Sequence, residues 1–299
     1  MAQWRYSQIS GDEAYLREKA LPVILAIAEF WADRVNYNSA KDRYEIRGVI
    51  GPDEHAGIRD NNATTNYGAA WTLRLATQLA LRFGRPCPPE WKMIADKMWI
   101  PFDEKEQRFV EFEGYAGQRI KQADTVFLFH PLGMPVSEKI KANTLDFYKQ
   151  RYPETVVMAS AAMDGIVECQ LGRNAESWAS FGKLLPYLRF PYMLGSEAPN
   201  NDGISYGASI SGVLQLALMG FGGVGYDDDG LVIQPCVPSE LGDLVLRGMN
   251  YGGVRFDLEI KAGKALITNA SASIKVKVRN SDKTEIIIHG EPKPIKALQ

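Results

Sequence analysis

Apolar residues recur every three or four positions along most of the first 225 or so residues, which is the spacing of amphipathic helices. In residues 12–36 an apolar stripe runs from Leu16 to Trp31, and Asp12 with Glu13 suits a helix N-terminus. The same spacing predicts further helices over 66–83, a short stretch after Pro88-Pro89, 137–150, 160–171, 176–188 and 205–221. The charged and aromatic residues 104–115 are predicted to form an extended loop on the surface, and no strand-like alternation precedes residue 230.

The pattern changes after residue 230, where short runs alternate apolar and polar residues between Gly, Asn and Asp. These runs are 231–233, 244–246, 254–260, 265–267, 274–278 and 285–288. They predict an antiparallel sheet or sandwich. The acidic run 227–229 before Gly230 lacks the spacing of a calcium loop and is predicted to be a solvated linker. We therefore expect a mainly α protein, with a helical portion over 1–226 and a small antiparallel β domain over 227–299.

Composition narrows the possible functions. The chain of 299 residues has a formal net charge of -2, which argues against nucleic acid as a partner. No run of eighteen apolar residues occurs, so no membrane span is expected. The three scattered cysteines slightly favour a reducing compartment such as the cytoplasm, although a signal peptide could precede this sequence in a longer chain. The three histidines have no ligand spacing and no nucleotide-binding glycine motif is found, so neither a metal nor a cofactor is expected.

The stretch Arg47–Asn66 contains the largest group of candidate functional residues. Gly51-Pro52 forces a turn, and the carboxyl groups of Asp53 and Glu54 follow directly. Further along, Asn61 and Asn62 supply amides that can bind the hydroxyl groups of a polar ligand. The simpler alternative is an ordinary loop with Asx turns that ends in a helix N-cap at Thr65 or Asn66.

Two other segments carry clustered polar residues. One is Lys121-Gln122-Ala123-Asp124, and the other is 191–203, which contains Glu197. In a helical barrel the loops at one end converge, so Glu54 and Glu197 would face each other. Glycoside hydrolysis needs such a pair, one carboxyl protonated to assist the leaving oxygen and one ionised to activate water. The alternatives are a surface ion pair between Lys121 and Asp124 and a solvated loop residue at Glu197.

Several of these segments together resemble glycoside hydrolase family 65. The resemblance runs from about residue 5 to about residue 260 and includes Val49–Asn66, the Lys121-Gln122-Ala123-Asp124 signature and the last helix, which ends near Val224. It implies an (α/α)6 barrel followed by a small β domain. It also implies an inverting hydrolase or phosphorylase acting on α-glucosides such as kojibiose, trehalose, maltose or a glucosylgalactosyl group. Glu54 would be the general acid, and Lys121 and Gln122 would contact the sugar.

The resemblance favours hydrolysis over phosphorolysis. Ser196-Glu197-Ala198 matches the context of the hydrolase base, whereas Gly203-Ile204-Ser205 lacks the histidine of the Gly-Ile-His phosphate loop. We expect the carboxyl groups of Glu54 and Glu197 to lie roughly 6.5 to 9.5 Å apart, which is the spacing for inversion. We also expect burial and the second carboxylate to raise the pKa of Glu54.

Family members are far longer than this chain. Their earlier barrel helices carry a Trp-Asp motif for which this sequence has no match. We therefore expect the C-terminal portion of such an enzyme. It is either a fragment of a longer chain, or its cleft is completed by a partner chain or within a homo-oligomer, or it is not active alone. The remaining alternative is a catalytically inactive sugar-binding fragment.

Overall fold

The computed structural model describes residues 1–189, 191, 194–197, 199, 205–227, 230–279 and 285–290. The chain divides into two compact units. Met1–Ser7 and Asp12–Thr155 form the N-terminal unit, and Gln8–Gly11 and Val156–Gln299 form the C-terminal unit. The helices after residue 155 therefore belong to the same unit as the strands that follow residue 223. The predicted division at 226 and 227, which followed the change from helix to strand, does not coincide with the limits of these units.

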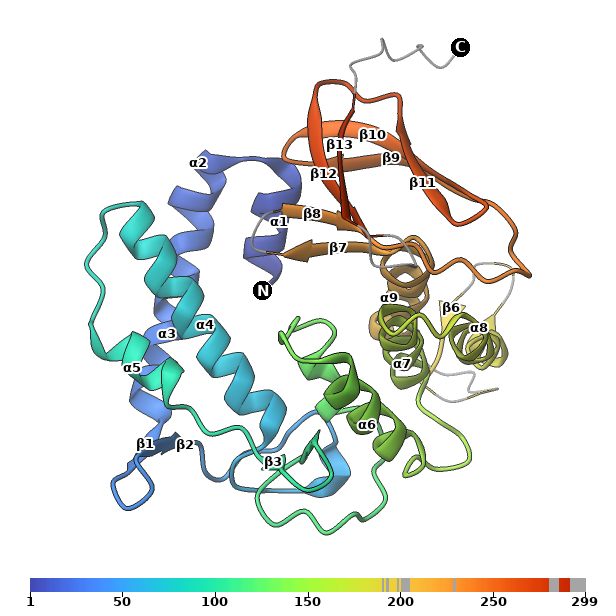
Figure 1. The fold of residues 1–299 in the computed structure, drawn as a ribbon. Helices are drawn as coiled ribbons and strands as arrows, with labels where there is room; N and C mark the ends of the chain where they lie inside the picture. Colours follow the sequence, from blue (N-terminus) through green and yellow to red (C-terminus); the bar gives the residue numbers. More distant parts are fainter. Residues whose placement is uncertain are drawn as a thin grey trace. The chain divides into compact units, whose positions relative to one another are not determined.

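Helices form most of the N-terminal unit (Figure 1). The predicted helix over 12–36 is a continuous run of α2 (Glu13–Tyr15), a π-helical turn (Leu16–Ala20) and α3 (Leu21–Arg34). The other predicted helices of this unit are α4 (Ala63–Arg82), α5 (Glu90–Asp96) and α6 (Glu138–Lys149). α1 (Ala2–Ser10) was not predicted, since its only buried residue is Ser7 and it carries no apolar stripe.

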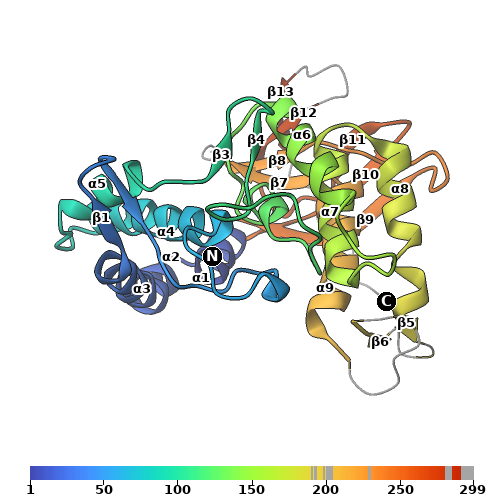
Figure 2. The ribbon, with the colours of Figure 1, turned by 90° about the horizontal axis from the view of Figure 1, so that it is seen from below.

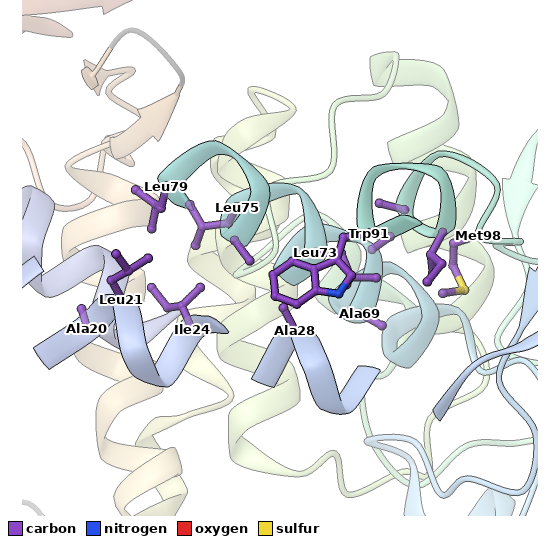
Figure 3. Close-up of a cluster of buried hydrophobic side chains, with 14 of the residues drawn as sticks. Ala20, Leu21, Ile24, Ala28, Ala69, Leu73, Leu75, Leu79, Trp91 and Met98 are labelled. Atoms are coloured by element: carbon purple, nitrogen blue, oxygen red, sulfur yellow. The ribbon is translucent and has the colours of Figure 1, made fainter. Parts of the chain in front are cut away.

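The core of this unit lies between α3, α4 and α5 (Figure 3). Leu21 and Ile24 of α3 pack with Leu73 and Leu79 of α4, and Trp91 of α5 lies within the same cluster. These side chains are almost completely buried. Burying such a side chain stabilises the fold by about 1.5–3 kcal/mol. The helix faces that carry these side chains therefore pack together, and the apolar spacing in the sequence identifies those faces.

Short strands interrupt the predicted helical portion over 1–226, and two hairpins of the N-terminal unit are among them. β1 (Asn36–Asn38) pairs with β2 (Arg43–Glu45), and β3 (Phe102–Asp103) pairs with β4 (Arg108–Phe109). Strands of two or three residues are too short to show alternation. The second hairpin lies in the predicted surface loop, and the residues that follow it reach the interior at Glu111.

In the C-terminal unit, α7 (Met158–Gln170) packs against α8 (Asn174–Gly182) and α9 (Gly207–Gln215), as Figure 2 shows. A π-helical turn (Leu216–Phe221) follows α9. The predicted helix over 176–188 ends early, and a 3-10 turn (Leu185–Tyr187) and the pair β5 (Leu188–Arg189) with β6 (Leu194–Gly195) follow it. No helix among the described residues is long and apolar enough to cross a membrane.

Two sheets complete this unit (Figure 1). One is antiparallel and has the order β11-β10-β9, with the bounds Lys264–Thr268, Val254–Lys261 and Leu244–Tyr251. The other has the order β13-β12-β8-β7, with the bounds Glu285–Gly290, Ile274–Arg279, Gly230–Ile233 and Val224–Asp227. In this sheet β8 and β12 are parallel, so the expectation of a purely antiparallel domain is wrong for that pair. The three strands between β8 and β12 supply the long crossover that a parallel pair requires.

Candidate active site

The candidate acid lies on a closed loop of the N-terminal unit. Backbone hydrogen bonds in both directions between Val49 and Arg59, at 2.9 and 2.8 Å, close the base of this loop. Glu54 begins a 3-10 turn, Glu54–Ala56, within it. A Cβ atom at Gly51 would overlap the Asn62 amide and the Asp124 carboxylate, so only glycine fits there. The turn before Glu54 is therefore held by close packing.

Lys121 and Gln122 lie against this loop, so they belong to the same site as Glu54. The Lys121 ammonium forms an ion pair with Glu54 Oε1, and Gln122 Nε2 donates to the carbonyl oxygen of Pro52. The Lys121 backbone N–H also donates to Asp53 Oδ1 at 3.1 Å. Three residues that the sequence singled out are thus brought together from segments almost seventy residues apart.

The expected rise in the pKa of Glu54 is not found. Its side chain is 58% exposed, and the hydrogen bond from Lys121, together with the charge of that lysine, lowers the pKa of Glu54. The prediction was wrong because it assumed a buried carboxyl beside a second carboxylate, whereas the neighbour is a cation. In this state Glu54 carries its negative charge at neutral pH.

A buried polar cluster holds the turn from the interior. Asp124 Oδ2 accepts hydrogen bonds from Asn62 Nδ2 at 2.8 Å and from the Asp53 backbone N–H at 3.3 Å. Thr64 Oγ1 donates to the Asp124 carbonyl at 2.9 Å. Burial raises the pKa of Asp124 to about 6 and also raises that of Asp53. The alternative of a surface ion pair between Lys121 and Asp124 is excluded, because Asp124 is buried and bonded to other groups.

Asn61 and Asn62, predicted to bind sugar, are both buried. Asn62 is the N-cap of α4, accepting from the Thr65 N–H at 2.8 Å, so the expected cap at Thr65 or Asn66 was misplaced. Asn61 has a positive φ, accepts from the Ile46 N–H at 3.1 Å and donates to Glu113 Oε2 at 2.9 Å. These internal bonds argue against direct sugar contact by either amide.

Sequence reasoning missed Glu111. Its side chain is 0% exposed. Burial, followed by the charges of Asp124 and Asp53, raises its pKa to about 9. The available signal was a single glutamate between the apolar residues Val110 and Phe112. Phe112 is buried, so that part of the segment runs through the interior instead of over the surface.

Glu197 lies in the C-terminal unit and is partly buried. Ser196 beside it is anchored, since its N–H donates to the Tyr187 carbonyl at 3.2 Å and its carbonyl accepts from Ser209 Oγ at 3.0 Å. The predicted phosphate-loop position at Gly203-Ile204 lies outside the described residues. The distance between Glu54 and Glu197 stays a prediction, since the two residues belong to different units.

Comparison with known proteins identifies the family to which the chain belongs. The sequence model for "Glycosyl hydrolase family 65 central catalytic domain" matches residues 1–119. A protein-glucosylgalactosylhydroxylysine glucosidase of Danio rerio is 31% identical over 288 residues, which cover 95% of this chain and 43% of the relative. A kojibiose hydrolase of Flavobacterium johnsoniae is 33% identical over 255 residues, covering 83% of this chain and 37% of the relative. The chain belongs to glycoside hydrolase family 65.

A solved structure shares the fold. The chain superposes on a putative kojibiose phosphorylase from human microbiome with a TM-score of 0.78 at 18% identity, covering 96% of this chain and 45% of that one. The chain therefore spans less than half the length of the relatives it matches.

Proposed function

We propose that this chain carries the acid and base of an inverting α-glucoside hydrolase. The observation that carries the proposal is the closed loop that presents Glu54, to which Lys121 and Gln122 are bonded from a distant segment. Relatives named for the hydrolysis of kojibiose and of glucosylgalactosylhydroxylysine support the substrate class, an α-linked glucosyl group on a second sugar. Glu54 is the general acid and Glu197 the general base.

The chemistry requires two proton transfers. Glu54 donates its proton to the glycosidic oxygen as the bond from that oxygen to the anomeric carbon breaks. Glu197 takes a proton from water as the water attacks from the opposite face, which gives a β-configured product. Because Lys121 stabilises the ionised form of Glu54 here, the acid form requires Lys121 to turn to the sugar hydroxyls when substrate binds.

The acid assignment is tested with Glu54→Gln. Loss of general acid catalysis typically costs about 10²–10⁴ in rate, so turnover of kojibiose by the complete protein falls by that factor. Glu106→Gln is the matched control, since Glu106 is an exposed glutamate that forms an ion pair with its neighbour Lys105. Equal rates for Glu54→Gln and the control would remove Glu54 from the mechanism.

The second candidate function is phosphorolysis, because the relatives of this chain also include proteins named kojibiose phosphorylase. An ionised Glu197 opposes it, because two like charges about 4 Å apart at an effective dielectric of 20 cost about 4 kcal/mol. Phosphate therefore neither accelerates glucose release nor yields glucose 1-phosphate. Accumulation of glucose 1-phosphate in phosphate buffer would overturn the assignment of Glu197 as base.

We further propose that the helices belong to an (α/α)6 barrel completed by polypeptide outside this sequence, which is the rest of a longer chain, a partner chain or a second copy. An apolar row on α3, made of Val23, Ile27 and Phe30, is exposed within the N-terminal unit and supports this. Sedimentation of this chain alone tests the proposal. Association that Phe30→Glu abolishes supports it, and a monomer at high concentration with unchanged solubility in Phe30→Glu contradicts it.

The remaining alternative is an inactive sugar-binding fragment. A chain that binds sugar without turnover, with the same affinity in Glu54→Gln, would identify such a fragment.

A further inference from the structure

Glu111 is a completely buried acid in the N-terminal unit. Its main chain is tied to the start of α4, because its carbonyl oxygen accepts from the Ala63 N–H at 2.8 Å and from Asn62 Nδ2 at 3.3 Å. Its two carboxyl oxygens are buried and have no hydrogen-bond partner among the described residues. A charged carboxylate without donors in such a place is very costly, so the neutral acid is the stable form.

The neighbouring acids differ from Glu111, because each accepts hydrogen bonds, although Asp124 Oδ1 is itself buried with no partner among the described residues. Asp124 accepts hydrogen bonds from Asn62 and from the Asp53 backbone, and Asp53 accepts from the Lys121 backbone. Hydrogen bonds donated to a carboxylate favour its charged form. Of these three buried carboxyl groups, Glu111 is therefore the one that keeps a proton.

We propose that Glu111 is a positioning residue, whose uncharged carboxyl group allows Asp124 to stay ionised and hold the turn that carries Glu54. The link to Glu54 runs through Asp53, because the Asp53 N–H binds Asp124 and Glu54 is the next residue. The catalytic consequence rests on the proposed function of Glu54, whereas the protonation state of Glu111 does not.

The groups around Glu111 determine the pH at which its carboxyl group loses its proton. Burial raises its pKa to about 9, the negative charges of Asp124 and Asp53 add to the rise, and Arg59 opposes it. The phenols of Tyr115 and Tyr148 also lie near, and burial raises the pKa of both, so they stay uncharged. Ionised Glu111 repels Asp124 and thereby weakens the hold on the turn.

The direction of the pH effect follows from linkage. The pKa of Glu111 is higher in the folded protein, about 9, than its ordinary value of 4.5, so folding takes up a proton between these values. The stabilisation is complete below about pH 4.5 and is lost as pH rises towards 9. Across that window this group weakens the folding equilibrium constant by about tenfold per pH unit.

The first experiment measures protonation directly in the full chain. Carbon-13 NMR follows the glutamate side-chain carboxyl signals with pH, and Glu111→Gln identifies the signal of Glu111 by its loss. A signal that titrates near pH 9 supports the proposal, and one that titrates near 4.5 overturns it. Glu106→Gln, which removes an exposed glutamate, is the control for assigning a carboxyl signal by substitution.

The second experiment separates positioning from simple packing in the complete enzyme. Glu111→Gln keeps the shape and the neutral charge, so we expect it to retain activity at pH 7. We expect kcat of the wild type to fall near pH 9, and we expect this fall to be absent in Glu111→Gln. An equal loss of kcat near pH 9 in the wild type and in Glu111→Gln overturns the proposal. If Glu111→Gln fails to fold, an unshifted Glu111 signal in wild-type spectra, assigned through backbone correlations, still overturns it. Absence of turnover in every variant and at every pH counts against the proposed function and leaves the NMR result to decide on Glu111.

Discussion

At the scale of single residues, the site depends on how closely the turn before Glu54 approaches the interior. Gly51→Ala places a methyl group against the Asn62 amide and the Asp124 carboxylate. We expect a loss of about 1–3 kcal/mol in unfolding free energy, measured by urea denaturation. Gly68→Ala is the control, since nothing lies within 4 Å of the new methyl group and α4 should gain about 0.5–1 kcal/mol. Equal effects of the two changes would contradict this account.

The charge state of Glu54 gives a second prediction at this scale. Lys121→Met removes the ammonium that stabilises the carboxylate, so the pKa of Glu54 rises towards its ordinary value. An NMR titration of the Glu54 carboxyl carbon measures the change. Lys105→Met is a suitable control, because Lys105 is exposed and contacts Glu106. An unchanged titration of Glu54 in Lys121→Met would show that the ion pair does not form in solution.

The site residues were predictable from sequence only in part. Glu54, Lys121 and Gln122 were recognised from short signatures, and the structure brings them together. Glu111 and the supporting role of Asp124 were missed, because burial depends on contacts between segments far apart in the chain and leaves no local pattern. The same reason explains why Asn61 and Asn62, polar and next to the motif, were taken for ligand-binding residues.

At the scale of elements, the helical period was a sufficient guide wherever one face is buried. It predicted α3 and α4 well and missed α1, which buries only Ser7. Strand pairing was less predictable, because alternation identifies strands without saying which strands are neighbours. The parallel pair of β8 and β12 is the clearest example.

The packing of α9 on α7 leads to a prediction about elements. A Cβ atom at Gly212 would lie 2.8 Å from Ala162 Cβ, so Gly212→Ala forces the two helices apart. We expect the unfolding free energy of the C-terminal unit to fall by about 1–3 kcal/mol. Gly207→Ala is the control, because α9 begins there and nothing lies within 4 Å. Equal stability of the two variants, measured by thermal unfolding, would show that α9 does not pack this way in solution.

At the scale of the whole molecule, each compact unit has its own hydrophobic core. Chains with two cores commonly unfold in more than one step. Five of the six tryptophans lie in the N-terminal unit, so Trp178→Phe leaves a fluorescence signal from that unit alone. We expect its urea midpoint to differ from the midpoint measured by circular dichroism at a wavelength dominated by the sheets. Coincident midpoints would show that the chain unfolds as one cooperative body.

The hydrogen bonds that join Asp53 to Asp124 and to Lys121 also bear on the order of folding. They join residues 71 and 68 positions apart, whereas the contacts within α4 span three or four positions. Local helical turns form in under a microsecond, but contacts that close long loops cost more chain entropy and therefore form more slowly. The helices can therefore form before the turn at Gly51 is fixed. During synthesis, Glu54 leaves the ribosome well before Lys121 and Asp124, and its loop acquires its final geometry only after they have followed.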